Sequence, residues 1–296
     1  MEIHSAQFFK DLVLGGNVGA AESYMEGHWS SPDLTSLFRL MIRNFQVLLG
    51  LESRWTLLQS FFHRLYHYSR KNSRRGSKKN IAEHYDLGNS FYELMLDESM
   101  AYSCAFFEEG NESLYDASIK KYDLLCRKLR LQEGDRLVEI GTGWGGFALH
   151  AARKYGCQVT TTTISKEQYR FAVKLVEEQG LADRIRVLND DYRDLQGSFD
   201  KLVSIEMIEA VGEQYFDEFF SKCSSLLRDH GMAAIQMITI PDQHYERHLR
   251  TVDFIKRYIF PGSTIPSLTA VLQSVRDSTN LRLRDLHDLT PHYAKT

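Results

Sequence analysis

The hydrophobic pattern of the chain changes its period near residue 80. Before that point the apolar residues follow a helical spacing, as in FFKDLVLGG, which we expect to stop at Gly15-Gly16, and in SSPDLTSLFRLMIRNF. After it, short apolar runs of strand length alternate with helix-like segments. The runs are RLVEIG (136–141), CQVTTTTI (157–164), RIRVLND (184–190), DKLVSIE (200–206), MAAIQMITI (232–240) and, as a further candidate strand, LRLRDLHDL (281–289).

This alternation predicts an α/β fold with a doubly wound, Rossmann-like parallel sheet and helices on both of its faces. We expect a small helical N-terminal domain at 1–69, a basic linker at 70–80 and the sheet domain at 81–296. Sheets of this kind bind ligands at the carboxyl ends of their strands, near the point where the strand order reverses. Candidate chemistry is therefore sought at those strand ends.

The composition is that of an ordinary globular protein, with 43% hydrophobic residues, 25% charged residues and a net charge of −3. It excludes collagen, a disordered tail and a multi-span membrane protein. The most apolar stretch, 40–51, is interrupted by Arg43, Asn44 and Gln46, whereas a membrane-spanning helix needs roughly 20 apolar residues. Four distant cysteines without a C-x-x-C pair, and no visible signal peptide, indicate reduced thiols in a cytoplasmic protein.

The small net charge hides a strongly basic segment. Between Ser53 and Ala82 there is no acidic residue, and aromatic residues are interleaved with eight basic ones. The basic residues are Arg54, Arg64, Arg70, Lys71, Arg74, Arg75, Lys78 and Lys79. Such a segment fits an anionic membrane surface. A solvated linker after a core helix is the alternative, and we expect no nucleic acid because no recognition motif accompanies the charge.

The segment LVEIGTGWGG places Gly141, Gly143 and Gly145 directly after the first predicted strand. Glycines there permit positive φ and a close approach of the backbone to a ligand, although a turn without a ligand is possible. A dinucleotide site expects an acid roughly 20 residues beyond the first glycine, where this chain has 161–163, all threonine. Glu139 would instead face the cationic end of S-adenosylmethionine, unless it is a solvated strand-end charge. No P-loop motif is present, so we favour S-adenosylmethionine.

Several ordered segments make the chain similar to the cyclopropane-fatty-acyl-phospholipid synthase family. They are HYDLGNSFYELMLDESMAYSCAFF (84–107), VEIGTGWGGFALHAA, TTISKEQ, DDYRDL, IEMIEAVG, DFIKRYIFPG and the closing HY, and GGNVGAAESYMEGHW resembles the N-terminal lipid-handling domain of the family. The resemblance implies a methyltransferase that adds a methylene from S-adenosylmethionine across a cis double bond of an unsaturated phospholipid acyl chain. It also implies peripheral association with the inner membrane surface and a possible homodimer.

The resemblance implies further cofactor-binding residues. Tyr102 and Ser103 would touch S-adenosylmethionine, and Thr163 and Gln168 would lie near its ribose and adenine. Tyr192 and Arg193 would line the adenine pocket. By its spacing alone, Gln168 would be interpreted as an exposed residue in the first turn of a helix.

The chemistry sets its own demands. An alkene attacks the sulfonium methyl only when both are held close together and away from water. The resulting carbocation closes the ring when the new methyl loses a proton, so a base is needed. Aromatic rings such as those of Tyr258, Phe260 and Phe106 are suited to stabilising the cation. The resemblance implies that a bound bicarbonate is the base and that five residues hold it. These five are Cys104, Glu209, Gln236, Ile238 and Tyr293.

Taken without the resemblance, Cys104 would more often be a small buried residue and Tyr293 a terminal surface residue. Many family members carry His where Gln236 and Ala210 stand, and they continue past the closing HY. We therefore expect a chain that lacks the C-terminal end of the domain and part of the N-terminal one.

Three alternatives stay open: C-methylation of the same alkene without ring closure, a shortened non-catalytic lipid-binding paralogue, and a small-molecule N-methyltransferase. No metal site is expected, because His244, His248, His287 and His292 lack a partner motif and are interpreted as surface residues.

Overall fold

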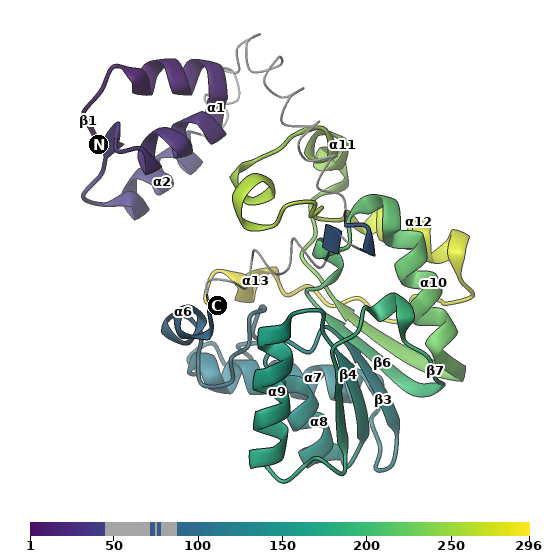
Figure 1. Ribbon diagram of the computed structural model, residues 1–296. Helices are drawn as coiled ribbons and strands as arrows, with labels where there is room; N and C mark the ends of the chain where they lie inside the picture. Colours follow the sequence, from purple (N-terminus) through teal and green to yellow (C-terminus); the bar gives the residue numbers. More distant parts are fainter. Residues whose placement is uncertain (45–71, 75, 78–87) are drawn as a thin grey trace. The chain divides into compact units, whose positions relative to one another are not determined.

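The computed structural model describes residues 1–44, 72–74, 76–77 and 88–296, which fall into two compact units. The N-terminal unit comprises Met1–Lys71 and Glu246–Gly262, and the sheet unit comprises Asn72–Tyr245 and Ser263–Thr296 (Figure 1). Most of the basic segment, including the predicted linker residues Arg75, Lys78 and Lys79, lies outside the described residues. The roles assigned to the predicted domains stay predictions.

The N-terminal unit is mainly helical. Its helix α1 (Gln7–Met25) breaks at Gly16, where φ is 55° and ψ is −137°, so the expected stop occurs there before the chain turns helical again. Strands β1 (Glu2–Ile3) and β2 (Trp29–Ser30) pair antiparallel. Helix α2 (Leu34–Arg43) follows, and the Asp33 carboxylate caps it by accepting the N–H of Ser36. The same unit contains the last residues of α11 (Asp242–Arg250) and a π-helical turn, η4 (Ile255–Ile259).

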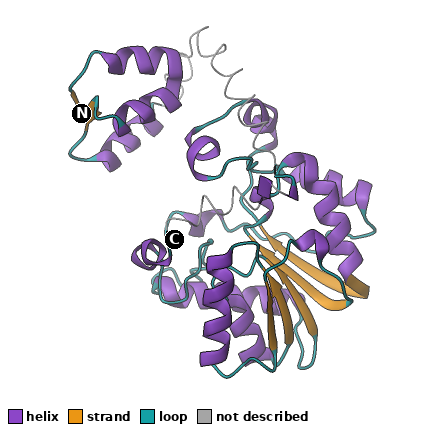
Figure 2. Ribbon diagram, in the orientation of Figure 1, coloured by secondary structure: helices purple, strands orange, loops and turns teal. Residues whose placement is uncertain are grey.

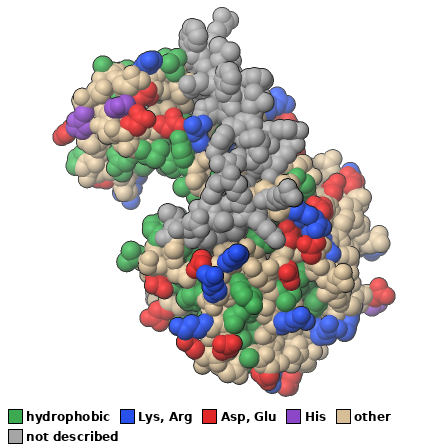
Figure 3. All heavy atoms as spheres, in the orientation of Figure 1, with side chains coloured by type: hydrophobic (Ala, Val, Ile, Leu, Met, Phe, Trp, Pro, Cys, Tyr) green, Lys and Arg blue, Asp and Glu red, His purple; other side chains and the backbone are tan. Residues whose placement is uncertain are grey.

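Trp29 is the centre of this small core. Its indole N–H donates to the carbonyl of Ala20 at 2.9 Å, and its ring lies 6.1 Å from that of Phe8 and 4.8 Å from that of Tyr24. Helix α2, in contrast, has no buried residue, and Ile42 is 71% exposed. Hydrophobic side chains accordingly gather on the visible surface of the unit (Figure 3). The apolar spacing predicted the helix correctly but not the exposure of its apolar face.

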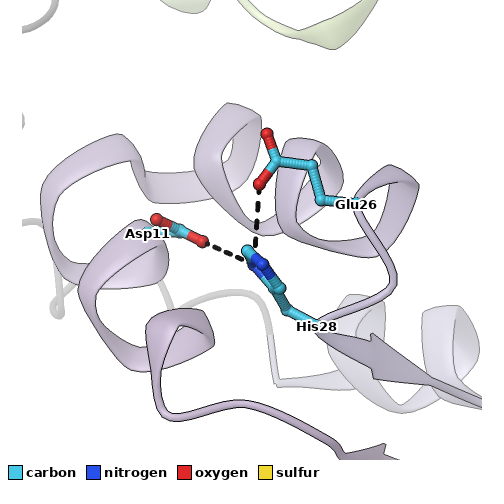
Figure 4. Close-up of side chains that lie close together, drawn as sticks. All are labelled: Asp11, Glu26 and His28. Carbon is cyan, nitrogen blue, oxygen red and sulfur yellow. Dashed lines mark hydrogen bonds and ion pairs between the residues drawn. The ribbon is translucent and has the colours of Figure 1, made fainter.

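A polar cluster ties the two ends of α1 to the start of β2. The ring nitrogen Nδ1 of His28 lies 3.2 Å from the Asp11 carboxylate and 3.6 Å from that of Glu26 (Figure 4). Hydrogen bonds from Gln7 and then from His28 and Ser23 lower the pKa of Asp11. The three side chains are close enough to share a metal ion, but their contacts with one another suffice to explain the cluster. The expectation of no metal stays a prediction.

The sheet unit confirms the predicted α/β fold. Its five strands are all parallel, in the order β5-β4-β3-β6-β7. They form one sheet that is flanked by helices (Figure 2). The strands are β3 (Arg136–Ile140), β4 (Gln158–Thr162), β5 (Ile185–Leu188), β6 (Phe199–Ile205) and β7 (Leu227–Gln236). The helices are α6 (Asn89–Met95), α7 (Leu114–Leu129), α8 (Gly146–Tyr155), α9 (Lys166–Glu178), α10 (Phe216–Leu226), α12 (Leu268–Ser278) and α13 (Thr290–Tyr293), with short 3₁₀ turns η1 (Tyr192–Asp194), η2 (Ile208–Ala210) and η3 (Glu213–Tyr215).

Both faces of the sheet are covered, because successive side chains of a strand point to opposite sides. Leu137 packs with residues of α7, α8 and α9, while Val138 and Ile140 pack with residues of α10 and α12. All three are at most 1% exposed, and burying such a side chain stabilises the fold by about 1.5–3 kcal/mol. Glu139 therefore points to the same side as Leu137, toward α7.

Two strand predictions are corrected. No strand forms at 281–289, where Leu283 and Leu286 remain more than half exposed, so the alternating pattern buries neither face of the segment. The run at 232–240 is a strand only as far as Gln236. Beyond it the backbone N–H of Ile238 donates to the Glu209 carboxylate, which takes the chain out of the sheet.

The expectation of surface histidines is wrong for His248, which is only 8% exposed. Among the helices that the structure describes, none is both long enough and apolar enough to cross a membrane.

Candidate active site

The carboxyl ends of β3 and β6 lie side by side at the centre of the sheet. From β3 the chain goes on to β4 and β5 on one side, whereas β6 and β7 lie on the other. The strand order thus reverses between β3 and β6, which is where doubly wound sheets bind their ligands. The glycine turn follows β3 at this point, and Glu206 follows β6.

The glycine turn has the predicted geometry. Gly141, Gly143 and Gly145 have φ of 100°, 54° and 95°, values that residues with a Cβ rarely adopt. At Gly141 a Cβ would also lie 3.3 Å from Cγ of Met207. The turn leads into the N-terminus of α8, whose free backbone N–H groups favour an anionic or electron-rich ligand atom.

Glu139 is buried at the end of β3, only 1% exposed. Its carboxylate accepts a hydrogen bond of 2.6 Å from Thr161, which lies opposite it on β4, and Thr161 in turn contacts Thr142 at 2.7 Å. Burial raises the pKa of Glu139 to about 8, although Thr161 and Lys121 lower it. The interpretation of Glu139 as a solvated strand-end charge is therefore wrong, and a cation placed beside it would favour its ionised form.

Lys121 is a buried cation that the sequence patterns did not reveal. It is completely buried on α7, and its Nζ donates to Oγ of Ser103 at 2.6 Å. Burial lowers its pKa to about 8, while the charge of Glu206, followed by those of Cys104 and Glu139, opposes this shift. The one available signal was its position on the buried face of α7, level with Ala117 and Leu125. A buried lysine needs partners of opposite charge, and here Glu206 is the main one, with Glu139 as a further partner in its ionised form.

The predicted pair Thr163 and Gln168 comes together after β4. The Thr163 hydroxyl donates to Oε1 of Gln168 at 2.8 Å, and Nδ2 of Asn189 donates to the carbonyl of Thr163 at 2.9 Å. Both side chains of the pair are buried, at 7% and 5% exposed. Gln168 is thus not the exposed first-turn residue that its spacing alone indicated. The hydroxyl of Ser165 caps the helix by accepting the backbone N–H of Gln168.

The predicted adenine-pocket residues are less open to a ligand. The guanidinium of Arg193 binds Asp191 through Nε at 2.8 Å and Nη2 at 2.6 Å, and it also donates to the carbonyl of Asn72 and the hydroxyl of Ser77. The ring of Tyr192 packs in the core below α10. Arg193 holds the 72–77 segment, and its adenine-binding role stays a prediction.

The segment around Cys104 is held against the ends of β6 and β7. The backbone N–H of Cys104 donates to Oε1 of Glu206 at 2.9 Å, and its carbonyl accepts from Nε2 of Gln236 at 3.1 Å. The same Gln236 amide donates to Oε1 of Glu206 at 2.9 Å. Burial raises the pKa of the Cys104 thiol, which makes it a poor nucleophile. Glu206 is a residue that the sequence patterns did not single out.

Glu209 lies beside this group, on η2. Its Oε1 accepts from the N–H of Ile238, and burial raises its pKa to about 7. In the described part of the chain, Oε2 of Glu209 and Oε1 of Gln236 are buried and have no hydrogen-bond partner. Buried polar atoms without a partner are rare and often mark a functional site. Four of the five predicted base-site residues therefore form two hydrogen-bonded pairs, Cys104 with Gln236 and Ile238 with Glu209, and Glu206 accepts from both members of the first pair.

Tyr293, the fifth, lies on α13 and is 47% exposed. Its pKa is raised by burial of the hydroxyl and by the charges of Glu206, Cys104 and Glu209 nearby. Thr296 also contacts the segment around Cys104, because its hydroxyl accepts the N–H of Ala105 at 3.1 Å.

The aromatic residues of the predicted site divide between the units. Tyr102 stacks edge-on against Tyr92 at 5.6 Å, and Tyr92 contacts Trp144 of the glycine turn at 4.9 Å. Tyr258 and Phe260 belong to the N-terminal unit, so their predicted role beside the cation stays a prediction.

Comparison with known proteins agrees with this geometry. Residues 72–296 match the family described as mycolic acid cyclopropane synthetase. Tuberculostearic acid methyltransferase UfaA1 of Mycobacterium tuberculosis is 37% identical over 95% of this chain and 67% of its own length. A probable fatty acid methyltransferase of Pseudomonas putida is 40% identical over 77% of this chain and 58% of its own. Cyclopropane-fatty-acyl-phospholipid synthase of Escherichia coli K12 is 33% identical over 100% and 74%.

Solved structures show the same relationship. Mycolic acid cyclopropane synthase CmaA1 complexed with SAH and CTAB superposes with a TM-score of 0.68, at 34% identity over 74% of this chain and 79% of its own. Cyclopropane synthase MmaA2 from Mycobacterium tuberculosis gives the same TM-score at 31% identity, with the same coverage of both chains. The chain belongs to the mycolic acid cyclopropane synthetase family of S-adenosylmethionine-dependent methyltransferases.

Proposed function

We propose that this protein transfers the methyl carbon of S-adenosylmethionine to the cis double bond of an unsaturated phospholipid acyl chain and closes a cyclopropane ring. One observation carries the proposal. The glycine turn and Glu139 lie at the same carboxyl end of the sheet as the hydrogen-bonded group of Glu206 and Gln236. Lys121 connects the two halves, because it binds Ser103 and is stabilised by the charge of Glu206 and, when Glu139 is ionised, by the charge of that carboxylate.

Each half suits one stage of the reaction. The Glu139 carboxylate would attract the positive charge of S-adenosylmethionine, and the glycine turn would let the polar end of the cofactor approach the backbone. After the alkene attacks the methyl carbon, the carbocation must lose a proton to a nearby base. The carboxylates of Glu206 and Glu209 are the candidates for this base. Glu209, with a pKa of about 7, would exchange protons readily at neutral pH.

The predicted bicarbonate does not fit these residues as they stand. The N–H of Cys104 and the amide of Gln236 already donate to Glu206, and the N–H of Ile238 donates to Glu209. A free anion would need these same donors. We therefore assign no step to bicarbonate.

C-methylation of the same alkene is the second candidate. It shares the first bond-forming step and the carbocation, which then loses a different proton and leaves a methylene branch. The relative named tuberculostearic acid methyltransferase, which aligns with 95% of this chain, favours it. Carbon-13 and proton NMR of the isolated lipid separate the two, because only cyclopropanation gives ring protons.

To test the proposal, the purified protein is incubated with S-adenosylmethionine and vesicles that contain cis-unsaturated phospholipids. We expect acyl chains heavier by one CH₂ group in the mass spectrum. Tight binding of S-adenosylmethionine in calorimetry without any change in lipid mass would contradict the lipid activity and favour the non-catalytic paralogue. No binding at all would contradict the methyltransferase assignment.

We also propose that the basic segment contacts an anionic membrane surface. Helix α2, which has exposed apolar side chains, comes before this segment in the chain, and this fits a peripheral lipid contact. Arg74 is excluded from the proposed contact, because it forms an ion pair with Asp194. A possible homodimer and the absence of nucleic-acid binding stay predictions.

Replacing Arg75, Lys78 and Lys79 with glutamine is expected to weaken binding to phosphatidylglycerol vesicles. Each cation near the surface contributes about 1 kcal/mol, so the affinity should fall roughly 100-fold. Vesicle sedimentation measures this, and the matched control replaces three exposed cations of the sheet unit, Arg153, Arg170 and Lys174. Equal affinities for the two triple variants would contradict a specific contact.

A further inference from the structure

We propose that Glu206 is a built-in substitute for a free anion, that its carboxylate occupies the anion position of the site, and that it takes the proton released by the carbocation. The inference rests on the proposed function for the second part only. Occupation of the anion position is a property of the folded chain and is testable without lipid.

Two hydrogen-bond donors converge on Glu206. Oε1 of Glu206 accepts the backbone N–H of Cys104 and the side-chain amide of Gln236, both at 2.9 Å. These residues belong to segments far apart in the sequence that meet at the ends of β6 and β7. Two converging donors, one from the backbone and one from an amide, form a small anion site, and the chain fills it with its own carboxylate.

The charges around Glu206 leave no place for a further anion. Lys121 is the buried cation next to this site, and Glu206 contributes more than any other charged group to stabilising its ammonium form. Glu209 faces the same region and has its pKa raised, chiefly by burial and in part by Glu206. A further anion would place a third negative group around one buried cation. A nearby like charge disfavours the ionised form of a group, so binding of a bicarbonate anion next to Glu206 is disfavoured.

The backbone of Glu206 is strained. Glu206 has φ of 47°, a left-handed conformation that costs energy for a residue with a long side chain. Its own N–H donates to the carbonyl of Gln236 at 2.8 Å, which holds the residue in this conformation beside β7. Strained residues of this kind concentrate at functional sites, where the surrounding structure maintains them. Glycine would adopt this conformation at no cost. The strain of a glutamate here is therefore explained by a need for its carboxylate.

The step balances without a further reactant. The alkene forms a bond to the methyl carbon, the carbon–sulfur bond breaks, and S-adenosylhomocysteine leaves as a neutral thioether. One C–H bond of the transferred methyl then breaks, its electron pair closes the ring at the cationic carbon, and the proton goes to the Glu206 carboxylate. Glu206 returns the proton to solvent before the next turnover.

Two variants of one residue test the proposal. Glu206→Gln keeps the shape and the acceptor oxygen but removes the base, so it leaves the anion position filled. Glu206→Gly empties the position and relieves the backbone, so it is expected to fold at least as well as the parent. Glu167→Gln is the matched control, because this acid of α9 is partly exposed and forms an ion pair with Arg170 on the surface of the helix.

Binding of carbon-13 bicarbonate, followed by NMR, is the first readout. We expect no saturable binding to the parent protein or to Glu206→Gln and saturable binding to Glu206→Gly. Binding to the parent protein as tight as to Glu206→Gly would overturn the proposal, whether or not any lipid product forms.

Turnover in bicarbonate-free buffer is the second readout. We expect full activity for the parent and for Glu167→Gln, and a loss of at least about 100-fold for both Glu206 variants. Added bicarbonate should restore Glu206→Gly and leave Glu206→Gln inactive. A parent enzyme that itself needs bicarbonate would overturn the inference but leave the proposed function intact. A parent enzyme without lipid product in any buffer would refute the proposed function, and the binding readout would still decide which anion fills the site.

Discussion

Replacing Lys121 with methionine is expected to lower lipid-modifying activity by about 100-fold, the usual effect of losing a preorganised charge at an active site. Methionine has a similar length and fills the same buried space on α7, but it removes the ammonium group that binds Ser103 and balances Glu206. We also expect the free energy of unfolding to fall by about 1–3 kcal/mol, because the Ser103 hydroxyl loses its partner and the nearby carboxylate loses its countercharge.

The neighbouring residue supplies the control. Lys120 lies on the same helix, is partly exposed and pairs with Glu112 and other acids of the surface. Surface ion pairs contribute about 1 kcal/mol or less, so Lys120→Met should change stability little and leave activity unchanged. Thermal unfolding and the lipid assay measure both variants. Parent-like activity of Lys121→Met would contradict the role of the buried cation.

Replacing Glu139 with glutamine is expected to weaken S-adenosylmethionine binding more than tenfold and to remove its dependence on pH. With a pKa of about 8, the Glu139 carboxyl of the free protein is mostly protonated at neutral pH. A bound cation favours the carboxylate, so binding should release a proton. The affinity of the parent protein should therefore rise as the pH increases from about 7 to about 9.

Calorimetry in two buffers of different ionisation enthalpy detects the released proton directly. Glu133→Gln is the matched control, because this acid is exposed and precedes β3 at the opposite end of the strand. Equal affinity and equal proton release for Glu139→Gln and the parent would show that the cofactor does not contact this side chain.

The parts of the fold that local pattern controls were predictable from the sequence. Each strand of the parallel sheet is an apolar run, because helices cover both faces, and the glycine turn follows from the need for positive φ. The segment at 281–289 has a similar alternation of residues but no face to bury, so pattern alone gave a wrong strand. Burial of Gln168 likewise depends on Thr163 and its neighbours after β4, not on the helical spacing that indicated exposure.

The candidate site was predictable only where a motif marked it. Glu206 and Lys121 acquire their roles from contacts between distant segments: Cys104 and Glu206 are separated by 102 positions and meet only in the folded chain. The left-handed backbone of Glu206 has no sequence signal either, since glutamate gives no indication of positive φ. The resemblance indicated the residues of the base site, whereas the hydrogen bonds of Glu206 with Cys104 and Gln236 are visible only in the folded chain.

We expect a carbon atom to move from S-adenosylmethionine to an acyl double bond at the carboxyl ends of β3 and β6. The most direct measurement uses S-adenosylmethionine with carbon-13 in its transferable methyl group, together with phospholipid vesicles that contain cis-unsaturated chains. We predict that the label appears in the lipid as a ring CH₂ at the position of the former double bond. Label that appears on a nitrogen atom, or that never reaches the acyl chain although the cofactor is bound, would contradict the account.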